Sequence, residues 1–285
     1  MIRRTWNCLC LSAALAGTLL GVNVASAYTP NLFLADNNRW PGAIIKVTRE
    51  GERDWHVVNP ADLPRDAREA VPRIGSVAIS PRGEVFYCSG LDGLIYKLEG
   101  GRPIVVHHHG PPVRDLGFGS QPDILFFSVV RTPQNGEPLT DGEIYRKNVR
   151  TGDYGRLGVV RQDEVGGNWW GSLAVHRGQL YISTMGRTSR ILRQRTTGWE
   201  TLMEASSHVI QGIDFENGGD LYFVAGTGMI HRSTNLRDIE NVTESRDSRF
   251  VDLALEPEGA SDLPGLGIEA ADAFLRTGDL ATGRP

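Results

Sequence analysis

Four histidines in two segments are the residues of this chain that best fit metal chemistry. His107, His108 and His109 are consecutive, and His208 lies much later in the chain. Neutral imidazole is the commonest transition-metal ligand in proteins. Because alternate side chains of a strand point to opposite faces, His107 and His109 share one face and His108 has the other. The pattern predicts a divalent metal site, for Ca²⁺ or Zn²⁺, formed by His107, His109 and His208. The alternative is that these are surface histidines at the end of a strand.

Three carboxylates are candidates for catalytic acid–base roles. Asp115 and Asp252 each lie near the start of an apolar segment, and Glu164 lies in a polar loop. Two carboxylates at the end of a channel can bind a cation or divide the roles of acid and base between them. A structural role is equally open, because buried carboxylates must be hydrogen-bonded and these two can connect neighbouring strands.

Two adjacent tryptophans are candidates for ligand binding. They lie in the segment GGNWWGS, where flat indole rings at a loop can stack on sugars or on aromatic ligands, and where glycines let the backbone approach closely. The alternative for one of the pair is an apolar cap on a core. The predicted ligand-binding residues are Asn168, Trp169 and Trp170, with Asn37 and Arg187 in nearby turns.

The elements that must position these side chains come from a repeat. A short apolar strand that follows a polar turn occurs five times, at intervals of roughly 40 to 55 residues, which fits the length of a propeller blade with variable loops. The five copies are NLFLAD from Asn31, EVFYCS from Glu84, DILFFS from Asp123, QLYIST from Gln179 and DLYFVA from Asp220.

Further strands flank each copy and complete a four-stranded unit. An inner strand precedes four of the copies, and third and fourth strands follow most of them. The first copy lacks an upstream inner strand, whereas an unpaired one, Val251 to Leu255, occurs near the far end. The sequence therefore predicts an all-β fold, a single β-propeller of five blades with four antiparallel strands each. We expect it to be closed by pairing of Val251–Leu255 with Leu32–Asp36, with six blades or a β-sandwich as alternatives.

This meander predicts where the site lies. The loops that lead into inner strands and the turns between second and third strands meet at one end of the ring. All of the candidate loops above fall at that end, and the opposite end has short turns rich in Pro, Gly and Asn. Function is therefore expected at the loop-rich end.

The N-terminus resembles a secretory signal. Arg3 and Arg4 precede an apolar run, and Ala25-Ser26-Ala27 fits a cleavage site. The prediction is a signal peptide over 1–27, a propeller domain over 28–257 and a partly ordered tail over 258–285. The protein is then exported, to the periplasm or beyond, with no membrane span in the mature chain.

Charge and cysteine content narrow the function classes. Cleavage leaves Cys88 as the one cysteine, so no disulfide forms within the domain. It also leaves 28 basic against 34 acidic residues, because only Arg3 and Arg4 are removed from the 30 basic residues. Without a basic stripe, nucleic acid is not an expected partner.

The segments SVAISPRGEVFYCSGLDGLIYKL and QGIDFENGGDLYFVAGTGMIHRS resemble blades of the NHL and SMP-30/gluconolactonase-like propellers. The resemblance implies a divalent metal at the channel mouth and lactone hydrolysis, with Glu164, Asn168 and Asp252 or Asp115 as counterparts of the metal ligands. The expected function is binding of a small molecule, glycan or protein at the loop-rich end. The alternative is a metal-dependent hydrolase or lyase.

Overall fold

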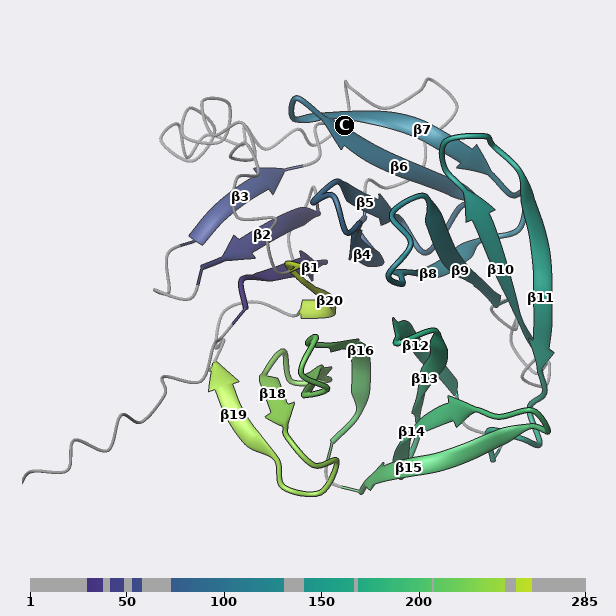
Figure 1. The fold of residues 1–285 in the computed structure, drawn as a ribbon. Coiled ribbons are helices and arrows are strands. Elements are labelled where there is room, and N and C mark those ends of the chain that lie inside the picture. The colour runs from purple at the N-terminus through teal and green to yellow at the C-terminus, as the bar shows by residue number, and fades with distance from the viewer. Residues whose placement is uncertain are drawn as a thin grey trace, which may run out of the picture.

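The computed structural model describes residues 30–37, 42–48, 53–57, 73–130, 141–166, 169–206, 208–243 and 250–257. These residues form five four-stranded antiparallel sheets, arranged radially around a central axis (Figure 1). The predicted signal peptide and the predicted tail lie outside the described residues. Within that described part, no helix has the length and apolarity needed to cross a membrane.

Each sheet is one blade, and its strands follow one another from the axis outward. Blade I contains β20 (Phe250–Leu255), β1 (Leu32–Asp36), β2 (Ala43–Val47) and β3 (Arg53–Val57). Blade II contains β4 (Ser76–Ile79), β5 (Val85–Cys88), β6 (Leu94–Glu99) and β7 (Arg102–His108). Blade III contains β8 (Val113–Phe118), β9 (Ile124–Val130), β10 (Gly142–Asn148) and β11 (Tyr154–Val160).

The last two blades repeat the same order. Blade IV contains β12 (Trp169–His176), β13 (Gln179–Met185), β14 (Ser189–Gln194) and β15 (Trp199–Ala205). Blade V contains β16 (Ile210–Phe215), β17 (Leu221–Ala225), β18 (Ile230–Ser233) and β19 (Glu240–Thr243). The inner strands are thus β4, β8, β12, β16 and β20, and the five repeated segments of the sequence are the second strands.

The ring closes in blade I, where the two ends of the domain share one sheet. β20 pairs antiparallel with β1, with Leu32 opposite Leu255 and Leu34 opposite Leu253. The pairing continues past the strands, because the N–H of Glu256 donates to the carbonyl of Asn31 at 2.9 Å. The predicted five-bladed propeller and its closure are confirmed. The six-bladed and sandwich alternatives are wrong.

The hydrophobic core lies between the blades. Both faces of the second strands are buried, as the all-buried strands β1, β5 and β17 show. Five apolar clusters fill the five interfaces between neighbouring blades. This explains why the repeated segments carry apolar residues on both faces instead of alternating apolar and polar residues: a strand buried on both faces has no solvent-exposed face.

Candidate functional site

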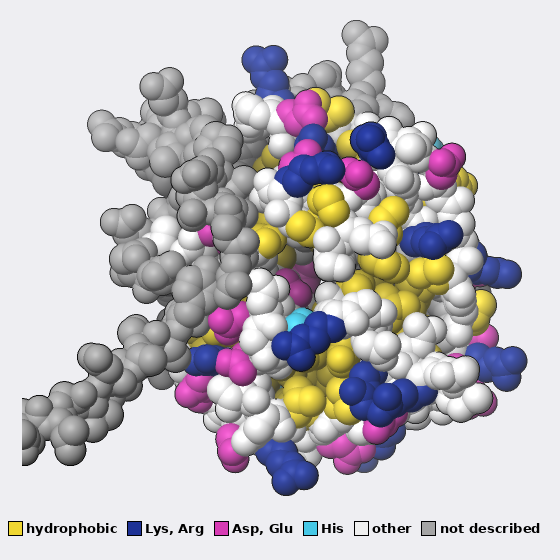
Figure 2. All heavy atoms as spheres, viewed as in Figure 1, with side chains coloured by type: hydrophobic (Ala, Val, Ile, Leu, Met, Phe, Trp, Pro, Cys, Tyr) yellow, Lys and Arg dark blue, Asp and Glu magenta, His cyan; other side chains and the backbone are white. Residues whose placement is uncertain are grey.

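The channel opens into a cavity at each end of the ring. The loop end is where loops lead into the inner strands, and the turn end is where hairpin turns leave them. The loop-end cavity is about 170 Å³ and the turn-end cavity is about 410 Å³. The larger cavity therefore lies at the end that the sequence analysis assigned to simple connecting turns. In Figure 2, acidic, histidine and basic side chains are each visible at the centre of the ring face that is shown, although most charged side chains lie toward the rim.

Between the two cavities, the inner strands are held together by a belt of polar side chains: Ser76, Asp115, Ser172 and Asp252. They occupy equivalent positions in the inner strands of four blades, and each accepts a backbone N–H from the inner strand of a neighbouring blade. All four are buried. The bonds are Leu116 N to Ser76 Oγ (3.0 Å), Ile213 N to Ser172 Oγ (3.2 Å), Val77 N to Asp252 Oδ2 (3.0 Å) and Leu173 N to Asp115 Oδ2.

The fifth blade has Gly212 at this position, and its neighbours explain why. A Cβ on Gly212 would lie 2.6 Å from both the Cα and the Oδ1 of Asp252. The Oδ1 of Asp252 also receives the hydroxyl of Ser172 at 3.4 Å. The space that a side chain on Gly212 would occupy is thus taken by the carboxylate from blade I.

The belt gives Asp115 and Asp252 a structural role. Burial raises the pKa of Asp115, and burial together with the charge of Asp115 raises the pKa of Asp252 well above its ordinary value. Both side chains are only 2% exposed and accept backbone N–H groups across blade boundaries. Of the two roles left open for this pair, the structure favours connection between strands over acid–base work on a ligand.

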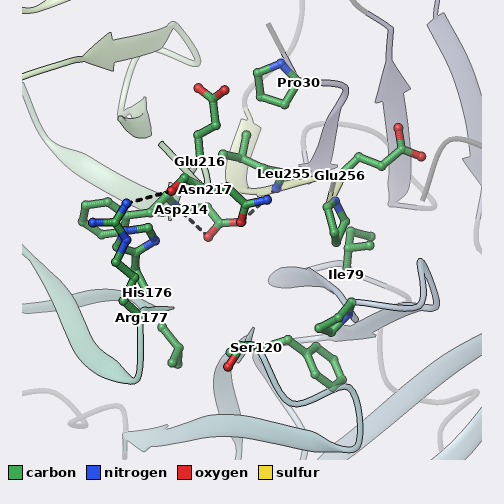
Figure 3. A pocket seen from close by; sticks show the side chains of 16 residues that line it. Pro30, Ile79, Ser120, His176, Arg177, Asp214, Glu216, Asn217, Leu255 and Glu256 are labelled. Atoms are coloured by element: carbon green, nitrogen blue, oxygen red, sulfur yellow. Dashed lines mark hydrogen bonds between the residues drawn. The ribbon is translucent and has the colours of Figure 1, made fainter. Parts of the chain in front are cut away.

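The turn-end cavity contains a carboxyl group in a different situation. Asp214, on β16, lines the cavity and accepts the N–H of Phe215 at Oδ1 and the N–H of Leu255 at Oδ2, both at 2.8 Å (Figure 3). It forms no ion pair with any residue that the structure describes. Enclosure by protein, with a smaller contribution from the charge of Asp115, raises the pKa of Asp214 to about 7. Near neutral pH this carboxyl group is close to half ionised.

The other polar groups of the cavity are placed around Asp214. His176 stacks on Phe215, with ring centroids 5.2 Å apart, and burial, with the charge of Arg177, lowers the pKa of His176, which favours the neutral imidazole. Arg177 donates from Nη2 to the carbonyl of Asn217 at 3.1 Å. In Figure 3, His176 and Arg177 lie on one side of Asp214 and Glu256 lies on the other.

Charge and shape in this cavity favour a particular class of ligand. The charge of Glu256 is balanced by Lys46, whose Nζ lies 2.8 Å from the Glu256 Oε1, and its Oε2 accepts a hydrogen bond from the side-chain amide of Asn31. Asp214 has no such cation. The lining is about equally polar and apolar, and its apolar part includes Ile79, Phe118, Val175, Phe215 and Leu255. A carboxylate without a counter-ion beside apolar walls suits an organic cation.

The predicted metal histidines do not meet in one cluster. His107 and His109 pack among aromatic rings between blades II and III. The ring centroids of His107 and Tyr154 lie 4.6 Å apart. The ring of His208 instead packs against the ring of His231 in blade V, with the ring centroids 4.7 Å apart. Burial lowers the pKa of His107 to about 4. The described residues hold no group of three or more His, Cys, Asp or Glu side chains placed to bind a metal ion.

The remaining predicted residues are dispersed. Glu164 is exposed in a turn, where its carboxylate accepts the N–H of Arg161 at 3.0 Å. Asn37 lines the loop-end cavity, and Arg187 is exposed outside it. Trp170 is 4% exposed in the core between blades III and IV, which corrects its expected position at a ligand-accessible loop. Asn168 and the side chain of Trp169 lie outside the described residues.

The sequence contains a signal for Asp214. Two residues after each belt position, the inner strands carry a small residue in four blades and an aspartate in the fifth. When a repeat has a small residue at one position in every blade but one, a charged residue in the remaining blade indicates a functional role for that residue. The five residues are Ala78, Gly117, Ala174, Asp214 and Ala254.

Comparison with known proteins supports the fold. No protein-family model matches the sequence, and no curated protein matches it. A gluconolactonase from Xanthomonas campestris is similar in structure, with 14% identity and a TM-score of 0.50 over 74% of this chain and 71% of that one. A protein of unknown function from Bacteroides thetaiotaomicron has 11% identity and a TM-score of 0.51 over 81% and 63%. TolB from Acinetobacter baumannii has 13% identity and a TM-score of 0.49 over 80% and 67%. At these identities the likeness concerns the β-propeller fold alone.

Proposed function

We propose that this protein is an exported β-propeller that binds a small organic cation, such as an amine, in the turn-end cavity. The observation that carries the proposal is Asp214: it lines a cavity of about 410 Å³ and forms no ion pair with a described residue. Its two backbone hydrogen bonds fix the carboxyl group in place. A bound ammonium group would supply the missing opposite charge, and the apolar walls would cover the organic part of the ligand.

The test uses benzylamine as the probe, with benzyl alcohol and benzoate as neutral and anionic analogues of similar shape. Titration calorimetry at pH 8 should show saturable binding of the amine and weaker binding of both analogues. Asp214→Asn should weaken amine binding by about tenfold or more, because it removes a charge-assisted hydrogen bond. Binding should strengthen as pH rises from 6 to 8, since the Asp214 carboxyl, with its pKa near 7, loses its proton over that range.

A matched control is available at the same end of the ring. Asp123 forms an ion pair with Arg82, with 2.7 Å between Oδ1 and Nη1, and it does not line the cavity. Asp123→Asn should therefore leave amine binding unchanged. Equal binding of benzylamine and benzyl alcohol, or full amine binding by Asp214→Asn, would show that Asp214 does not recognise a cation.

Export is the second part of the proposal, and it rests on the sequence of residues 1–27. Mass spectrometry of protein from the exported fraction should find a chain that begins at Tyr28. Recovery of a chain that still carries Met1 or Arg3 would contradict it.

Metal-dependent hydrolysis of a lactone is the alternative function, which rests on the sequence resemblance to gluconolactonase-like propellers. Its test is metal analysis of the purified protein together with a lactone hydrolysis assay. Stoichiometric metal that His208→Ala removes and His176→Ala keeps would favour this alternative over cation binding.

A further inference from the structure

We infer that the loop-end cavity is a binding site for a small oxyanion, a carboxylate or phosphate group, held by Arg114 and Arg73. This site is separate from the turn-end cavity and independent of the function proposed above. Its volume of about 170 Å³ fits a single such group or a small diacid. Two observations support it: β-bulges in the inner strands orient side chains toward this cavity, and two arginines line it.

The inner strands are irregular at one repeated position. In β8, β16 and β20 the pairing register shifts at the residue just before the belt position, which leaves Arg114, Gln211 and Val251 as the extra residues of β-bulges. A bulge re-aims the side chain of the extra residue, and bulges occur often beside functional sites. All three of these residues line the loop-end cavity.

The remaining two blades have glycine at the equivalent place. Gly75 and Gly171 also line the cavity. A Cβ at Gly75 would lie 2.7 Å from the carbonyl oxygen of Ser89, and one at Gly171 would lie 2.3 Å from the Oγ of Ser183. The five blades therefore contribute one cation, one amide, one apolar side chain and two glycines to this mouth of the channel.

The charges at this mouth favour an anion. Arg114 is half-buried and Arg73 is exposed, and neither forms an ion pair with another described residue. Asp115, the carboxyl group in the cavity lining, already accepts the backbone N–H of Leu173 within the belt. Guanidinium groups bind carboxylates and phosphates through paired hydrogen bonds, and the amides of Gln211 and Asn37 add further donors.

The experiment measures binding of two probes, inorganic phosphate and succinate, to the mature protein (residues 28–285) by titration calorimetry at low ionic strength. We expect one-to-one saturable binding of at least one probe. Arg114→Gln and Arg73→Gln should each weaken it by about tenfold, and the double variant should abolish it. The probe that binds more tightly identifies whether carboxylate or phosphate is the preferred group. Because Arg73 is exposed, its variant keeps the test decisive even if Arg114→Gln fails to fold.

Two controls make the result specific. Arg187 is exposed at the same end but outside the cavity, so Arg187→Gln should leave anion binding unchanged. Asp214→Asn, at the other end of the channel, should also leave it unchanged, which separates this inference from the cation site. No saturable binding of either probe, or an equal loss in Arg187→Gln, would overturn the inference.

Discussion

Ending the chain at residue 249 is expected to abolish cooperative folding. This change removes β20, the inner strand of blade I, whose Phe250, Leu253 and Leu255 are buried against β1 and blade V. It exposes the inner edge of β1, and unpaired strand edges promote aggregation. It also removes Asp252, which accepts the N–H of Val77 at 3.0 Å and so connects blade I to blade II.

Burying a large apolar side chain contributes about 1.5 to 3 kcal/mol, so losing three of them removes an amount comparable to the whole stability of a typical domain, about 5 to 15 kcal/mol. The truncated protein should be insoluble or should melt without a cooperative transition, as measured by circular dichroism and sedimentation.

The control is a chain that ends at Pro257, which keeps β20 together with Glu256 and its contact to Lys46 at 2.8 Å. This longer chain should melt cooperatively. A soluble chain ending at residue 249 with an unchanged melting temperature would mean that the ring does not depend on closure by β20.

The fold could be predicted because the information for it is repeated five times. One apolar strand is ambiguous, but five copies, each buried on both faces in the structure, specify blades stacked around an axis. The missing inner strand of the first copy and the surplus strand near Val251 then predict closure of the ring from the sequence alone. Propeller geometry depends on local sequence patterns that recur in each blade, so the fold can be predicted from the sequence.

The site could not be predicted in the same way, because it depends on single departures from the repeat. The histidines are metal-ligand candidates by residue type alone. In the structure, however, the ring centroids of His109 and Tyr145 lie 4.4 Å apart in an aromatic interface, which residue type does not reveal. In the sequence, Asp214 is a polar residue within a largely apolar strand segment. Its importance comes from its surroundings, namely a cavity and the absence of a described cationic partner, and the packing of all five blades determines these.

Trp170 shows the same limit, because an indole in a glycine-rich loop segment has the composition of a stacking platform. In the structure it packs with Ile144, Val160 and Leu173 between blades III and IV. Gly142 lies directly against it, and a Cβ there would be 2.4 Å from the indole ring. The glycine and the tryptophan therefore form a complementary pair in which one residue leaves the space that the other fills.

Replacement of Trp170 by alanine is therefore expected to destabilise the protein by about 3 to 5 kcal/mol, the cost typical of removing a buried aromatic side chain and leaving a cavity. For a domain of this size such a loss lowers the melting temperature by roughly 10 °C, which differential scanning calorimetry will detect. Leu91→Ala is the control, because Leu91 is 51% exposed and its loss should change the melting temperature little. Binding of amines at the turn end and of anions at the loop end should persist below the melting transition of Trp170→Ala, since this indole lines neither cavity. If the variant instead kept its melting temperature and lost ligand binding, the indole would be a binding group, and the core position assigned to it here would be wrong.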